Sequence, residues 1–236
     1  MTDQTPPLVL ASASPRRHEL LGSLGVPFAV VATDAEERRD PVPQAVLAAL
    51  PPYPLDRDGH PCLLAWRKAN AAREAGHEAA ILGADTIVVL DQAVLGKPRD
   101  PAHARLMLRQ LSGRTHRVYT GLVGLPALRD RAPEPRFDLV WSDVRLAELS
   151  EAAIAEYVET GEPLDKAGSY GIQGMGGRLV EQVEGSFTAV VGLPLPAAAA
   201  LLEQIGVAVP VAVAEAWLRW RRTLAKEPLC IQQSKC

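Results

Sequence analysis

The segment Ala80–Leu90 constrains the fold of this chain more than any other, because it is long and almost entirely apolar. Such a run predicts a strand buried on both faces, and strands of that kind belong to sheets that carry helices on both sides. Asp85 interrupts the run. Because an unpaired buried carboxylate is costly, we expect Asp85 to have a cation or a water as its partner. It is either a ligand-binding acid at a crevice or a paired structural acid.

The chain opens with a predicted strand at 8–12, a helix at 15–24 and a second strand at 28–32. The next segment, about 41–61, is rich in proline and predicts a surface excursion with one helical turn. Further along, the apolar periodicity predicts more helices and strands. These are a helix at 63–75, the strand at 80–90, a turn at 91–94, a helix from 101 to 112, strands at 115–125 and 137–147, a helix at 152–160, strands near 178–184 and 187–192, and a helix at 196–204. The order predicts one α/β domain with two lobes around a cleft.

The turn after the first strand has the composition of an anion site. Ser14 is a predicted N-cap and Pro15 fits the first helical position, so backbone N–H groups and the positive end of the helix dipole face a ligand above the strand. Arg16 and Arg17 add charged donors that suit a phosphate. The alternative is an ordinary capped helix whose arginines are solvated.

The composition of the chain limits which partners it can bind and which compartment suits it. The chain has 236 residues and a formal net charge of −3, which gives no general attraction to nucleic acid or to an anionic membrane. Its 3 cysteines lack metal-ligand spacing and indicate a reducing compartment, without a disulfide framework or structural zinc. The polar N-terminus lacks a signal-peptide pattern, and no window reaches the roughly 18 apolar residues of a membrane span. We therefore predict a cytoplasmic protein.

Residues 207–236 form a predicted C-terminal extension with an amphipathic helix around Trp217 and Arg222. Its basic face suggests a nucleic-acid contact, but the row of basic residues on this face is short and no other part of the chain is as basic. We favour a solvated helix that packs its tryptophans on the core or on a second subunit, and we predict no stable nucleic-acid binding.

Several charged residues at strand–helix junctions are candidates for one cleft. The cations are Lys68, Lys97 and Lys166, with Arg16 and Arg17. Glu37 with Asp85 offers oxygen ligands of the kind that Mg²⁺ takes, although their wide separation in sequence makes the pairing weak. For each cation the alternative is a solvated surface charge.

A glycine-dense loop at 165–177 can bring backbone N–H groups close to a ligand. Within it, the side chain of Gln173 carries both a donor and an acceptor and can read the edge of a base. A flexible loop without a ligand is the alternative. The chain has no P-loop, nucleophile elbow, zinc helix or dinucleotide fingerprint, so the commonest energy-coupled, hydrolytic and hydride-transfer sites are disfavoured. His116 is expected to be structural.

Five blocks of sequence, taken together, resemble the Maf family of nucleoside triphosphate pyrophosphatases over about residues 8–206. The blocks are Ala11–Arg17, Gly83–Thr86, Gly96–Pro98, Ser112–His116 with Thr120–Gly121, and Asp165–Gly174 through Gly192–Pro194. The resemblance implies the fold of the inosine triphosphate pyrophosphatases (Maf/Ham1): a long, twisted mixed sheet with flanking helices and two lobes around a central cleft. It also implies hydrolysis of a nucleoside triphosphate to the monophosphate and pyrophosphate with a divalent metal, Mg²⁺ or Mn²⁺, and a homodimer.

The resemblance also implies roles for single residues. Asp85 matches the catalytic acid, and Glu37 would join it in catalysis and in holding the metal. Positions associated with substrate choice are Arg16, Thr86 and Gln173. Lys68 and Lys97 match further cleft residues of the family. Apart from the resemblance, we also expect substrate to be bound by Ser12, Ser14, Arg17, Asp165 and Lys166.

The form of the glycine loop is similar to that of the subgroup acting on dTTP and UTP, with modified pyrimidine nucleotides as further substrates and house-cleaning of nucleotide pools as the task. The rival hypothesis is a nucleotide-binding regulator of septum formation without significant catalysis. Two parts of this chain depart from the family pattern: the 41–61 insertion and the chain beyond 206.

Overall fold

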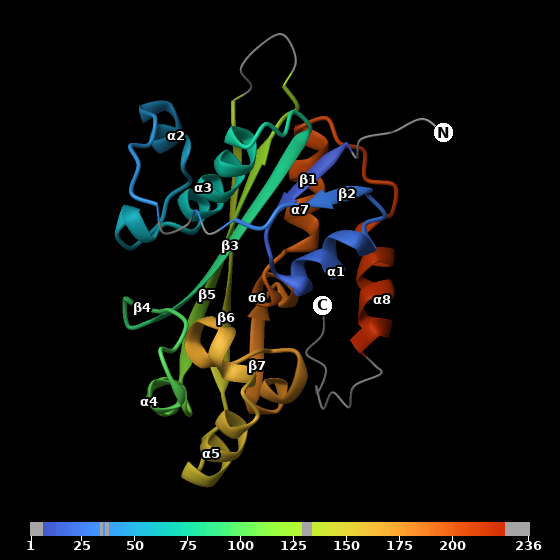
Figure 1. Ribbon diagram of the computed structural model, residues 1–236. Helices are drawn as coiled ribbons and strands as arrows, with labels where there is room; N and C mark the ends of the chain where they lie inside the picture. Colours follow the sequence, from blue (N-terminus) through green and yellow to red (C-terminus); the bar gives the residue numbers. More distant parts are fainter. Residues whose placement is uncertain (1–6, 34, 36–37, 129–133, 225–236) are drawn as a thin grey trace. The chain divides into compact units, whose positions relative to one another are not determined.

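The computed structural model describes residues 7–33, 35, 38–128 and 134–224. Figure 1 shows the helices and strands along this part of the chain. In order, they are β1 (Leu8–Ala11), α1 (Pro15–Ser23), β2 (Phe28–Val30), α2 (Gln44–Ala49), η2 (Arg57–Gly59), α3 (Pro61–Glu74), β3 (Ala80–Leu90), β4 (Ala93–Leu95), α4 (Pro101–Leu111), β5 (Thr115–Leu125), β6 (Arg136–Leu146), α5 (Glu151–Glu159), η3 (Glu162–Asp165), η4 (Ala167–Ser169), η5 (Gly174–Leu179), β7 (Val180–Gly185), α6 (Phe187–Val191), α7 (Leu195–Gln204) and α8 (Val213–Leu224).

A seven-stranded mixed sheet runs through the protein, with the strand order β2-β1-β3-β5-β6-β7 and with β4 paired to β3. β1 is parallel to both β2 and β3, whereas the β3–β4 and β6–β7 pairs are antiparallel. This arrangement confirms the predicted α/β fold class with a mixed sheet. None of the helices in the described ranges is both long enough and apolar enough to cross a membrane.

The chain divides into two compact units. Unit 1 comprises 1–85, 120–140 and 192–220, and unit 2 comprises 86–119, 141–191 and 221–236, taken over their described residues. The long strands β3, β5 and β6 each contribute residues to both units.

The core of unit 1 lies where α3 packs against the sheet. Two glycines make this contact close: a Cβ atom at Gly83 would fall on the carbonyl oxygen of Ala65, and one at Gly121 would fall on the backbone of Cys62. Only glycine allows a helix backbone to approach a strand this closely. The thiol of Cys62 is buried there and donates to the carbonyl oxygen of Asp138 at 3.1 Å, and burial raises the pKa of this thiol.

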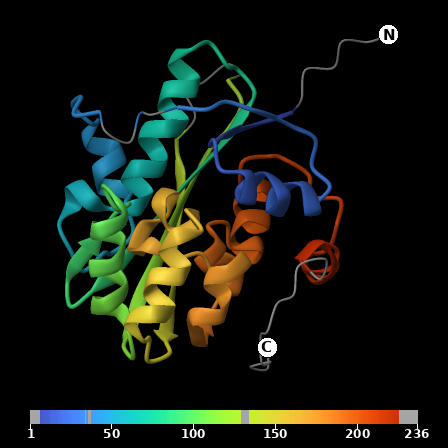
Figure 2. The ribbon, with the colours of Figure 1, turned by 60° about the horizontal axis from the view of Figure 1, so that its bottom comes forward.

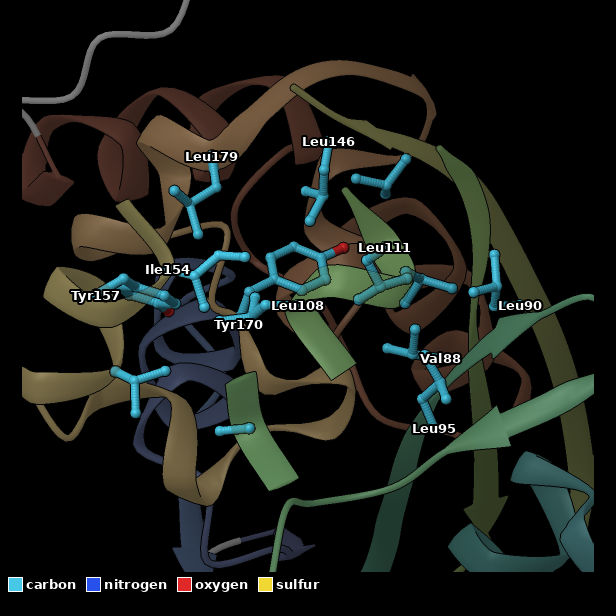
Figure 3. Packing of buried hydrophobic residues seen from close by; sticks show 14 residues of the cluster. Val88, Leu90, Leu95, Leu108, Leu111, Leu146, Ile154, Tyr157, Tyr170 and Leu179 are labelled. Atoms are coloured by element: carbon cyan, nitrogen blue, oxygen red, sulfur yellow. The ribbon is translucent and has the colours of Figure 1, made fainter. Parts of the chain in front are cut away.

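The core of unit 2 collects apolar side chains from β3, β5, β6, α4, α5 and the glycine loop. Figure 2 shows α4 and α5 side by side, and Figure 3 shows the ring of Tyr170 within this cluster beside Leu108 and Ile154. Burying such side chains contributes roughly 1.5–3 kcal/mol each. The glycine loop is therefore fixed to the core by the Tyr170 ring.

Most of the predicted elements are confirmed within one or two residues, and the strands at 80–90 and 115–125 have the predicted bounds. The strand predicted at 187–192 is wrong, because Phe187–Val191 is the short helix α6. Its β-branched residues favour a strand, but the Ser186 hydroxyl accepts the N–H of Ala189 at 3.2 Å, as an N-cap does. The local cap outweighs the propensity of this short run.

Two turns also differ in detail. The turn predicted at 91–94 is shorter: Asp91 and Gln92 have φ of 49° and 69°, as in a two-residue hairpin turn, and β4 follows at once. Ser14 occupies the N-cap position of α1, but its side chain makes no capping bond. Instead, its N–H donates to the hydroxyl of Ser12 at 3.2 Å.

The proline-rich segment 41–61 forms α2 and η2, and Val46 of α2 is buried in the core of unit 1. The predicted C-terminal amphipathic helix is α8. Ala216 and Trp220 are buried, while Arg219, Arg221 and Arg222 are exposed. The tryptophan stripe is thus partly buried and the basic face is solvated.

Candidate active site

Parallel pairing places the first turn of the chain beside the acidic position of β3. Ala11, the last residue of β1, is in register with Gly83 of β3. Ser12 follows Ala11 directly, and Asp85 lies two residues beyond Gly83 on the same face of its strand. The turn that carries the arginines therefore adjoins Asp85, because β1 and β3 run in the same direction.

Asp85 is paired with Lys68. The Nζ atom of Lys68 donates to Oδ1 of Asp85 at 2.6 Å, and the two side chains are only 9% and 14% exposed. The contact between Ala65 and Gly83 explains this pairing, since Lys68 lies one helical turn after Ala65 and Asp85 two residues after Gly83. The prediction that this carboxylate has a cation or a water as its partner is confirmed, and the partner is Lys68.

The two neighbouring arginines have different surroundings. Arg17 is buried: its Nε donates to the carbonyl oxygen of Gly192 at 2.9 Å, and its Nη1 donates to the hydroxyl of Ser12 at 3.1 Å. The side chain of Arg16 is partly exposed and makes no hydrogen bond or ion pair with another described residue. Arg17 thus joins the turn to the chain before α7, whereas the guanidinium of Arg16 is available to a ligand.

The glycine loop belongs to unit 2 and is built from the short turns η3, η4 and η5. The N–H of Gly168 donates to the carbonyl oxygen of Gly96 at 3.1 Å, next to the exposed Lys97. Lys166 donates through Nζ to the backbone oxygen of Glu162 at 2.7 Å and to Oδ1 of Asp165 at 2.6 Å. Backbone and side-chain hydrogen bonds thus hold this loop in place.

Gln173 lies in the middle of this loop and is partly buried. Its side-chain oxygen Oε1 is buried and has no hydrogen-bond partner among the described residues. Buried polar atoms are nearly always hydrogen-bonded, so this acceptor is a candidate to receive a bond from a water or a ligand. Thr86, which follows Asp85 on β3, is also partly buried.

The predicted metal pair is only partly placed, because Glu37 lies outside the described residues. Within the described ranges, no group of three or more His, Cys, Asp or Glu side chains gathers as a metal site would.

His116 is structural in its contacts, as expected: it is buried on β5, and its Nε2 is hydrogen-bonded to the hydroxyl of Tyr170 at 2.7 Å.

Sequence reasoning missed Glu162 and Tyr157, whose side chains contact the glycine loop. The Tyr157 hydroxyl donates to Oε1 of Glu162 at 2.9 Å, and both side chains bind backbone N–H groups of the loop. The only signal in the sequence is the density of glycines. A glycine has no Cβ, so a run of glycines leaves room that side chains from elsewhere in the chain can fill. That signal does not say which residue fills the room.

The fold and the site define an α/β protein with a buried acid–lysine pair beside a strand–helix turn that carries arginines. Residues 7–205 match the family described as Maf-like protein, and the chain belongs to the Maf family.

Curated relatives are similar over most of their length. A protein of Escherichia coli O6:K15:H31 (strain 536), named dTTP/UTP pyrophosphatase, is 48% identical over 80% of this chain and 87% of its own. A protein of the same name from Symbiobacterium thermophilum is 45% identical over 84% of this chain and 94% of its own. Among solved structures, the Staphylococcus aureus Ham1 protein aligns with a TM-score of 0.41 at 11% identity, covering 93% of this chain and 99% of that one.

Proposed function

We propose that this chain is a nucleoside triphosphate pyrophosphatase that hydrolyses dTTP and UTP to the monophosphate and pyrophosphate. The observation that carries the proposal is the buried Lys68–Asp85 pair, at 2.6 Å, beside the turn that carries Arg16. Relatives at 45–48% identity that are named dTTP/UTP pyrophosphatase support it.

In this proposal, Asp85 accepts a proton from the attacking water. The water oxygen forms a bond to the α-phosphorus as the bond from that phosphorus to the bridging oxygen breaks, and pyrophosphate leaves with that oxygen. Lys68 holds Asp85 in place through the hydrogen bond from its Nζ atom to Oδ1 at 2.6 Å. Arg16, Lys97 and Lys166 would neutralise phosphate charge.

The donor set suits a divalent cation. Lys68 occupies Oδ1 of Asp85, which leaves Oδ2 as a hard oxygen ligand. Mg²⁺ is usually held by one or two carboxylates together with substrate phosphates, so Asp85, with Glu37 from outside the described residues, would be sufficient. When bound, such a cation offsets phosphate charge and lowers the pKa of a bound water.

Gln173 and Thr86 would determine which nucleotide base the site accepts. Uracil and thymine each present an N3–H donor between two carbonyl acceptors, and the unpartnered Oε1 of Gln173 is an acceptor that fits this donor. Cytosine presents an acceptor at the same position, so it would face the Gln173 oxygen with lone pairs on both sides. Modified pyrimidines that keep the N3–H would be accepted, as a house-cleaning role requires.

A panel of nucleoside triphosphates tests the proposal. The purified chain is incubated with dTTP, UTP, dCTP, dATP and dGTP, with Mg²⁺, with Mn²⁺ and with EDTA, and pyrophosphate and phosphate are measured separately. We expect pyrophosphate with dTTP and UTP, and loss of turnover in EDTA. Binding of dTTP without pyrophosphate release would overturn the proposal and favour a nucleotide-binding regulator instead.

A further inference from the structure

The carboxylate of Glu162 gathers three hydrogen-bond donors. Its Oε1 accepts from the Tyr157 hydroxyl at 2.9 Å and from the N–H of Gly176 at 3.2 Å, and its Oε2 accepts from the N–H of Met175 at 3.0 Å. Hydrogen bonds to a charged acceptor are roughly twice as strong as those between neutral groups. A single side chain thus fixes the segment that directly follows Gln173.

The segment before Gln173 is tied to the same pair of side chains. The N–H of Gly171 donates to the Tyr157 hydroxyl at 3.1 Å, and that hydroxyl donates to Glu162 in turn. Burial raises the pKa of Tyr157, so its hydroxyl keeps its proton and can donate and accept at once. Gln173 is therefore bracketed: the backbone is held before it at Gly171 and after it at Met175 and Gly176.

The glycines of the loop fit closely around this bracket. A Cβ atom at Gly174 would lie 3.0 Å from Oε2 of Glu162, and one at Gly176 would fall on the Tyr157 hydroxyl. At Gly171 it would lie 2.7 Å from Cε of Lys166 and 3.2 Å from Oε1 of Glu162. At these three positions the loop leaves space for the side chains of Glu162, Tyr157 and Lys166.

We propose that Glu162 and Tyr157 are positioning residues that hold the carboxamide of Gln173 with its acceptor toward the base, and so set the preference for thymine and uracil over cytosine. This inference rests on the proposed function. A carboxamide offers an acceptor on one side and donors on the other, and which base it accepts depends on the side that it presents. Without these tethers the backbone on both sides of Gln173 can shift, and its carboxamide can then present its NH₂ group to the N3 acceptor of cytosine.

The test compares Glu162→Gln and Tyr157→Phe with the matched control Glu159→Gln, an exposed acid on the same helix α5 as Tyr157. The measured quantity is kcat/KM for dTTP divided by kcat/KM for dCTP. We expect this ratio to fall about tenfold in both variants, the size of one lost discriminating hydrogen bond. The kcat with saturating dTTP should stay within about threefold of wild type, and the control should keep the wild-type ratio.

A purely structural role would lower kcat for all nucleotides in proportion and leave the ratio unchanged, which would overturn the inference. Amide hydrogen exchange gives a second readout: protection at Met175 and Gly176 should fall in Glu162→Gln and stay at the wild-type level in Glu159→Gln. If Glu162→Gln does not fold, Tyr157→Phe decides the question through the ratio.

The two proposals fail in different ways. A wild-type chain that releases no pyrophosphate from any nucleotide overturns the proposed function, and the positioning inference with it. A wild type that prefers dTTP, with variants that keep the same preference, overturns the positioning inference alone.

Discussion

The Lys68–Asp85 pair and the Gln173 loop hold their polar groups by different means. Lys68 and Asp85 sit on a helix and a strand whose backbones touch at Gly83, so periodicity and register bring the two charges together. Gln173 sits on a loop whose shape depends on hydrogen bonds to two side chains, Glu162 and Tyr157. Where regular elements position a site, backbone contacts set the geometry, and few side-chain substitutions alter it. Where a loop positions a site, the geometry depends on a few side-chain hydrogen bonds, and one substitution can remove several of them.

The largest expected effect tests the chemistry of the first region. Asp85→Asn keeps the shape of the side chain but removes the charge and the base, so we expect kcat for dTTP to fall by about 10³-fold. Steady-state pyrophosphate release at saturating dTTP measures it. Asp100→Asn is the matched control, because Asp100 is an exposed N-cap and asparagine caps a helix equally well. Turnover by Asp85→Asn at the wild-type rate would remove Asp85 from the chemistry.

The next effect tests the backbone contact of the same region. Gly83→Ala sets a methyl group against the Ala65 carbonyl oxygen and 2.9 Å from Cγ1 of Val123, so α3 must move. We expect a loss of about 3 kcal/mol in the free energy of unfolding, because backbone atoms cannot turn aside as a side chain can. Urea unfolding measures it, with Gly22→Ala as control: its added Cβ meets nothing within 4 Å in helix α1, and it should stabilise by about 0.5 kcal/mol. Equal stability of the two variants would show that α3 is free to shift.

The smallest effect concerns His116, whose Nε2 is hydrogen-bonded to the hydroxyl of Tyr170 in the glycine loop. Burial lowers the pKa of His116 from 6.5 to about 4, so the folded state disfavours the proton. The resulting stability is complete above pH 6.5 and is lost as the pH falls toward 4, by about 2 kcal/mol between pH 7 and pH 5. The measurement is urea unfolding at both pH values for wild type, for His116→Gln and for the control His77→Gln. If His116→Gln kept the full pH dependence of wild type, the acid sensitivity would lie elsewhere.

The parts of the molecule that follow from periodicity were predictable from the sequence. The strand at 80–90 is apolar throughout apart from Asp85 and Thr86, and a buried carboxylate in such a strand needs a partner, which the structure supplies in Lys68. The partner itself could not be chosen from several candidate cations, because the choice depends on how closely α3 approaches Gly83.

The parts that depend on single side chains were not predictable. The segment 187–192 has the β-branched composition of a strand, yet the Ser186 cap makes it a helix. In the sequence, Glu162 follows a helix-ending glycine and cannot be told from a solvated acid. Its hydrogen-bond partners Met175 and Gly176 are more than ten residues further along, and only the folded loop brings them to it. Adjacent arginines likewise look alike in sequence, although Arg17 is buried and Arg16 is partly exposed.

The bond from Arg17 to Gly192 joins residues 175 positions apart. During synthesis, the strand and helix that carry Arg17 emerge early, but the carbonyl oxygen that accepts from its Nε emerges only when most of the chain has been made. Contacts of such long range are completed late in folding, because the loop between the partners must first be closed. The arginine-bearing turn, although made of the first residues of the fold, is therefore one of the last parts of the molecule to reach its final form.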